Sequence, residues 1–174
     1  MSSFFFESKV LTIREEPIMA KSIDTWLNEY GESHQNKTNK LIHWICVPGI
    51  FVTVVGLLWA IPVPEVLAIH PWINWASFTL VLVSLFYLRL SPRLLVGIVL
   101  FSLASMGIVS WHEQANYYGL VESCVVVFVV LWVFQFIGHK IEGKKPSFMQ
   151  DIQFLLIGPA WLMGFTYRKL GLRY

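Results

Sequence analysis

Three histidines at the ends of long apolar segments are the side chains in this sequence best suited to metal or redox chemistry. His34 and His43 lie at the start of the first long apolar run, and His139 lies at the end of a later one. Imidazole nitrogens bind iron, zinc and copper. Ionisable groups are costly at membrane depth unless they are paired, so such groups are candidates for a functional site. The pattern predicts either a metal centre or a buried polar network.

Two of these histidines follow an amide side chain at helical spacing. Asn39 and His43 are four residues apart, and Gln135, His139 and Glu142 follow one another at intervals of four and three. Each set therefore lies on one face of a helix. We expect the amides and Glu142 to orient the histidine rings, or Glu142 to serve as a further ligand.

The polar segment 33–37 must turn the chain if His34 and His43 are to share one centre. The two residues are nine positions apart, which would place them on opposite sides of one continuous helix. We expect a new helix after this turn, with Thr38 as its N-terminal cap.

Composition identifies the protein class to which these motifs belong. Of the 174 residues, 56% are hydrophobic and only 14% are charged, which is too apolar for a water-soluble domain of this length. A net charge of +2 gives no basic surface for nucleic acid, which we exclude as a partner. We expect a flexible extension over residues 1–19, with Met19 as an alternative start, and one membrane-embedded helical domain over residues 20–174.

Hydropathy predicts an all-α, polytopic bundle of membrane helices. A short amphipathic helix at the membrane interface is expected over 22–30. Four apolar segments are long enough to span a bilayer, and a shorter fifth segment with a Gly-Pro pair is expected to be broken or re-entrant and to form one wall of a site. The four spans are 41–61, 72–88, 94–111 and 123–138, and the fifth segment is 152–167.

The distribution of basic residues sorts the histidines into two groups. Lysines and arginines flank the first span, the loop between the second and third spans, and the end of the fourth, while the other two loops have none. The positive-inside rule then places His34, His43 and His139 on the cytoplasmic side. His70 and His112 fall on the opposite side, and we exclude them from the site.

The two histidine motifs resemble a family of small membrane proteins related to the fungal endoplasmic-reticulum 2-hydroxy fatty acid dioxygenase of phytosphingosine breakdown. The resemblance covers roughly residues 22–170. The first motif has Tyr, His, Asn, His and Pro at fixed spacing, and the second is Gln-Phe-Ile-Gly-His-Lys-Ile-Glu-Gly-Lys-Lys-Pro; these are Tyr30, His34, Asn39, His43 and Pro48, and residues 135–146. The residues of the first motif are similar to those of the bacterial branch of the family.

The resemblance implies an iron(II)-dependent enzyme that uses O2 to convert a long-chain 2-hydroxy fatty acid into CO2 and a fatty acid one carbon shorter. It implies that His34, His43 and His139 are iron ligands, with the acyl chain held between helices. The implied location is a multi-pass protein of the bacterial inner membrane, in contact with membrane lipid.

Two other functions remain open from the sequence. One is a non-enzymatic scaffold or lipid-binding protein in which the histidines form a structural hydrogen-bond network. A small transporter is the other, although no acidic or basic residue lies deep within a predicted span.

Overall fold

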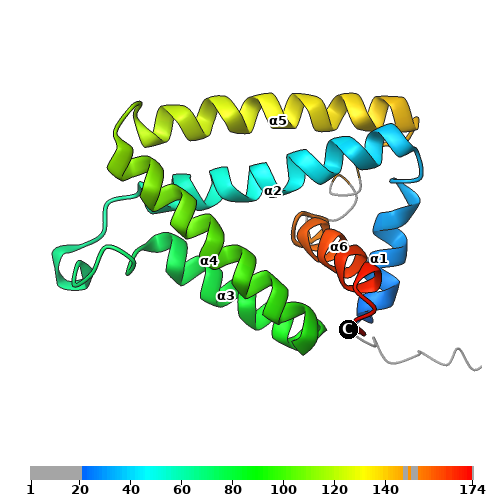
Figure 1. Cartoon of the computed structure of the whole chain (residues 1–174), viewed down its shortest axis with the longest axis horizontal. Coiled ribbons are helices and arrows are strands. Elements are labelled where there is room, and N and C mark those ends of the chain that lie inside the picture. The colour runs from blue at the N-terminus through cyan, green and yellow to red at the C-terminus, as the bar shows by residue number, and fades with distance from the viewer. Residues whose placement is uncertain (1–20, 147–148, 150–152, 174) are drawn as a thin grey trace, which may run out of the picture.

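The computed structural model describes residues 21–146, 149 and 153–173, and these residues form an entirely helical fold. Figure 1 shows α2 and α5 side by side, with α3 and α4 crossing beneath them at an angle and α1 and α6 packed at one end. The helices are α1 (Ile23–Glu32), α2 (Lys37–Trp59), α3 (Trp75–Leu90), α4 (Pro92–Ala115), α5 (Leu120–Glu142) and α6 (Phe154–Lys169), with a short 3-10 helix, η1 (Glu65–Leu67). The expected extension 1–19 lies outside the described residues.

Three of the helices, α2, α4 and α5, are long and apolar enough to cross a membrane. The predicted second span corresponds to α3, which has 16 residues and begins at Trp75 rather than Trp72. Its start is fixed by Asn74, whose side chain accepts a hydrogen bond from the backbone N–H of Ser77 while the Ser77 hydroxyl accepts one from the backbone N–H of Asn74. At about 1.5 Å per residue, α3 is about 24 Å long, which is shorter than α2, α4 and α5.

Helix α2 is the central element, because it contacts α3, α4, α5 and α6. Its closest neighbour is α5, which runs antiparallel to it (Figure 1). Glycines on α2 allow this approach, since a Cβ atom at Gly56 would collide with the sulfur of Cys124 on α5. Cys46 and Cys124 are both buried free thiols. The outer face of α5 remains exposed and rich in valine and phenylalanine.

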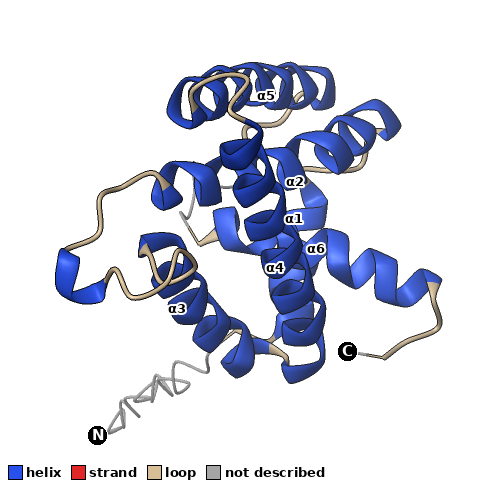
Figure 2. Cartoon of the chain, turned by 60° about the vertical axis from the view of Figure 1, so that its left-hand side comes forward, coloured by secondary structure: helices blue, strands red, loops and turns tan. Residues whose placement is uncertain are grey.

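Two clusters of buried apolar residues hold the helices together. The first core cluster lies where α1 packs on α6, and includes Trp26, Tyr30, Phe154, Ile157 and Trp161. The second core cluster lies toward the other end of α2, and comprises Val55, Trp59, Ala76, Met106 and Val109. Seen from the side in Figure 2, α1 and α6 lie next to α2 and below α5. The apolar face of α1 is thus covered by protein.

Helix α6 differs from the expected broken segment, because the described part, Phe154–Lys169, is one continuous helix with Pro159 inside it. Proline removes the hydrogen bond to the carbonyl four residues earlier. The carbonyl left without a helical donor is that of Leu155. The helix is nevertheless packed on α1, α2 and α4, and the Tyr87 hydroxyl of α3 donates a hydrogen bond to the neighbouring Leu156 carbonyl.

Candidate metal centre

The turn between α1 and α2 places His34 opposite His43. Helix α1 ends at Glu32, where the backbone N–H of His34 still donates to the Gly31 carbonyl. Helix α2 then begins at Lys37 with Asn36 as its N-cap, whose side chain accepts hydrogen bonds from the backbone N–H groups of Thr38 and Asn39. The prediction that Thr38 caps this helix is wrong by two residues. The backbone N–H of Thr38 instead donates a hydrogen bond to the Asn36 side chain.

The three histidines come together at the end of the α2–α5 pair. The ring centroids are 4.3 Å apart for His34 and His43, 5.0 Å for His34 and His139, and 4.9 Å for His43 and His139. One ligand atom from each ring lies within 4.8 Å of the other two, and all three side chains are buried. This spacing is suited to three imidazoles arranged around one cation.

Backbone carbonyls fix which nitrogen of two rings faces the centre. His34 Nδ1 lies 2.6 Å from the Tyr30 carbonyl oxygen, and His43 Nδ1 lies 3.0 Å from the Asn39 carbonyl oxygen. A carbonyl oxygen only accepts hydrogen bonds, so each Nδ1 carries the proton and each Nε2 has a free lone pair when the ring is neutral. This arrangement is common for metal-binding histidines.

The site also keeps His34 uncharged. Burial, reinforced by the neighbouring His43, lowers the pKa of His34 to about 3, so the ring is neutral at pH 7 and available as a ligand. Among the described residues, neither His34 Nε2 nor His139 Nδ1 has a hydrogen-bond partner, although both are buried. Buried polar atoms are normally satisfied, so these two indicate a place for a bound group.

An aromatic wall from α1 and α6 encloses the histidines. The Tyr30 ring stacks on His34 with centroids 4.1 Å apart and planes 12° apart, and Trp161 lies 5.6 Å from the same imidazole. Burial raises the pKa of the Tyr30 hydroxyl above its usual range, which keeps this group protonated. Trp161 was not expected in the site, because its role depends on the packing of α6 on α1 and no local motif marks it.

Glu142 connects the end of α5 to the turn between α1 and α2. Its carboxylate accepts hydrogen bonds from the backbone N–H groups of Gln35 (2.7 Å) and Asn36 (2.9 Å) and from the Asn39 side-chain amide (3.0 Å). Both carboxylate oxygens therefore accept hydrogen bonds from groups other than the three imidazole rings. Of the two roles considered for Glu142 from the sequence, the geometry favours support of the site over ligation.

The two amides expected near the histidines occupy different positions. The Asn39 side chain is fully buried and donates to the Ser33 carbonyl (3.0 Å) and to Glu142, so it holds the turn that carries His34. Gln135 lies in the wall of a cavity beside the histidines, one turn before His139. His70 and His112 lie outside the histidine group.

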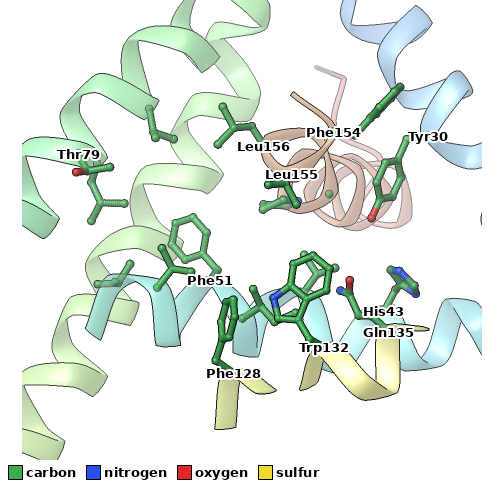
Figure 3. Close-up of a pocket in the computed structure, with 18 of the residues that line it drawn as sticks. Tyr30, His43, Phe51, Thr79, Phe128, Trp132, Gln135, Phe154, Leu155 and Leu156 are labelled. Carbon is green, nitrogen blue, oxygen red and sulfur yellow. The ribbon is translucent and has the colours of Figure 1, made fainter. Parts of the chain in front are cut away.

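This cavity, called the central cavity below, has a volume of about 340 Å³ and extends from the histidines between α2, α3, α5 and α6. Figure 3 shows Tyr30, His43 and Gln135 at one end, with Phe51 and Thr79 toward the other. Phe154, Gly158 and Pro159 from the fifth apolar segment line it, which agrees with the expected wall. The volume is in the range of small-molecule sites.

We expect alanine at Gly138 to loosen the site, because a Cβ atom there would collide with the Asn39 side-chain oxygen. Overpacking of this kind costs about 1–3 kcal/mol. Gly107 on α4 is the matched control, since a Cβ atom there meets nothing within 4 Å and alanine is the better helix former. Thermal unfolding in detergent should show a lower midpoint for Gly138→Ala only. Equal shifts for both variants would contradict the tight contact between α2 and α5.

Most of this chain is similar to proteins that are already known. A model of the family described as "2-hydroxy-palmitic acid dioxygenase Mpo1-like" matches residues 20–170. The chain is also 29% identical over 149 residues to the 2-hydroxy-palmitic acid dioxygenase MPO1 of Saccharomyces cerevisiae, an alignment that covers 83% of this chain and 79% of the yeast protein. No solved structure matches the chain.

Proposed function

Since the chain belongs to the Mpo1-like family, we propose that it is an iron(II)-dependent dioxygenase that performs α-oxidation of long-chain 2-hydroxy fatty acids. One 2-hydroxy acid and one O2 would give one fatty acid shorter by one carbon, one CO2 and one water. The bond between C1 and C2 breaks, C2 becomes the new carboxyl carbon and C1 leaves as CO2. The substrate loses four electrons and O2 gains four, so the reaction needs no separate reductant.

The convergence of His34, His43 and His139 is the observation that supports this proposal most strongly. Their ligand atoms lie within 4.8 Å of one another, and a buried unpartnered nitrogen of His34 is directed to the group. We propose that the three rings hold one iron(II), with Nε2 of His34 and His43 as ligand atoms. Bound iron would supply electron transfer to O2 and a Lewis acid for the substrate carboxylate and hydroxyl.

The other residues of the site would bind and shield the substrate. The central cavity is lined mainly by apolar side chains from Val47 to Leu58 of α2 and from facing helices, and it would hold the acyl chain away from water. Gln135 would offer its amide to the polar head. The protonated Tyr30 hydroxyl, which also lines the cavity, would donate a hydrogen bond to an anionic group there.

We further propose that the protein is a multi-pass protein of the bacterial inner membrane with the histidines on the cytoplasmic side. In this arrangement α3 is a fourth, shorter span. The lysine and arginine distribution supports this orientation, and the exposed apolar face of α5 suits contact with lipid.

The direct test is to purify the protein without oxygen, measure its metal content, and then supply 2-hydroxypalmitate and air. We expect iron at about one ion per chain and a product one carbon shorter, detected by mass spectrometry together with CO2. The yeast dioxygenase is the positive control. If metal-replete protein leaves a series of 2-hydroxy acids unchanged while the yeast protein converts them, the proposed reaction is wrong.

A structural hydrogen-bond network is the competing explanation for the buried histidines. The contacts of Asn39 and Glu142 would serve that role without metal. This alternative predicts metal-free purified protein whose unfolding temperature does not change when a chelator is added. The dioxygenase proposal predicts a lower unfolding temperature after chelation, because a ligand that binds only the folded state stabilises it.

A further inference from the structure

We propose that the central cavity limits the length of the alkyl chain that the substrate can have. Leu58 and Leu80 form the floor that sets this limit. The inference rests on the proposed function only for the identity of the occupant, a 2-hydroxy acid. The cavity itself gives the orientation of such a molecule, its maximum length and the residues that its last carbon would contact.

The orientation follows from the separation of polar and apolar groups along the cavity. Its polar side chains gather at the histidine end, with Thr79 as the exception near the far end. His139 also lines an open groove on the outside of the protein, together with Lys140, Lys144 and Lys145. A carboxylate is attracted to this end by the positive charges, so the alkyl tail extends toward α3.

The length follows from α2, which lines the cavity from one end to the other. Val47, Ile50, Val54 and Leu58 are spaced by three or four residues, so they share the helix face that borders the cavity. From His43 to Leu58 the helix advances 15 residues, or about 22 Å. An extended alkyl chain advances about 1.3 Å per carbon, given a C–C bond of about 1.5 Å. The cavity therefore accepts at most about 17 carbons.

The far end of the cavity borders the second core cluster. Leu58 and Leu80 both line the cavity, and both pack against the buried residues of that cluster, which include Trp59 and Ala76. A longer chain would have to displace this core, because protein interiors are close-packed. The floor is thus a fixed stop for the chain.

Tryptophan substitutions at three depths test this inference. Ile50, Val54 and Leu58 are 7, 11 and 15 residues beyond His43, so the added rings block the cavity at about 10, 16 and 22 Å. Each step of four residues should shorten the longest accepted chain by about four or five carbons. For Val54→Trp, which blocks the cavity at about 16 Å or about twelve carbons, the preference for a sixteen-carbon over a twelve-carbon acid should fall at least about 10-fold, since each buried methylene contributes about fourfold.

The matched control is Leu100→Trp, which makes the same change at an exposed position of α4 outside the cavity lining. The readout without turnover is photo-crosslinking under argon, using 2-hydroxy acids of about ten to twenty carbons with a diazirine on the last carbon. We expect the sixteen-carbon probe to label peptides around Leu58 and Leu80. In Val54→Trp this labelling should be lost while the shorter probes still bind.

The outcomes separate the two proposals. Labelling at the floor without turnover in air would support the proposed limit on chain length and would contradict the proposed dioxygenase reaction. If Val54→Trp and Leu100→Trp turn over acids with the same chain-length profile, or if labelling falls outside the cavity, the proposed limit on chain length is wrong while the proposed reaction stands.

Discussion

Replacing His139 with alanine is expected to remove the metal and reduce dioxygenase activity by at least about 100-fold. Loss of supporting groups around a metal ligand already costs about 10–100-fold, and loss of a ligand itself costs more. We expect the variant to keep its fold, because His139 lies in the last turn of α5 and the close contacts of α2 with α5 involve residues that precede it. Metal content by elemental analysis and turnover of 2-hydroxypalmitate are the two measurements.

His112→Ala provides the matched control for this experiment. His112 lies in the last turn of α4 and outside the group of three histidines, so its removal should leave metal content and turnover unchanged. Similar metal loss in both variants would refute the assignment of the centre to His34, His43 and His139. Circular dichroism of each variant should show that helix content is retained.

The second large effect is expected for Glu142→Ala, which removes the acceptor for two backbone N–H groups and the Asn39 amide. The turn that carries His34 then loses its connection to α5, and His34 moves relative to the other two ligands. We expect metal affinity to fall by about 10–100-fold. Titration with cobalt(II) in competition with a chelator measures this affinity.

Glu142→Gln distinguishes support from ligation. The glutamine keeps one acceptor oxygen but presents an NH2 group where the second oxygen accepted, so its affinity for cobalt(II) should lie between those of the native protein and Glu142→Ala. With Glu142 in a supporting role, the visible spectrum of bound cobalt(II) keeps its shape in the glutamine variant. A changed spectrum would identify Glu142 as a ligand. Glu65→Ala, at an exposed carboxylate in η1, is the control for loss of charge.

The sequence by itself determined the helical class and the positions of the helices. The apolar runs predicted at 41–61, 94–111 and 123–138 correspond to α2, α4 and α5, with ends that differ by a few residues. Helical hydrogen bonds connect residues only four positions apart, so local periodicity is sufficient to locate a helix. The same local rule placed Asn39 with His43 and Gln135 with His139 on common faces.

Local signals were weaker where an end or an interruption depends on particular contacts. The cap of α2 is Asn36 rather than Thr38, which is a choice between two good capping residues two positions apart. Pro159 suggested a break in α6, but the helix is continuous and packs on three other helices. Tertiary contacts outweigh a single unfavourable residue in such a case.

Only the tertiary structure decided how far the three rings are from one another and what Glu142 contacts. Glu142 and Gln35 are 107 residues apart in the chain but joined by a hydrogen bond of 2.7 Å. Contacts of this kind depend on which helices pack together, through matched surfaces such as Gly138 against Asn39. The central cavity and its floor arise in the same way, because five helices contribute to the lining and no segment alone encodes its shape.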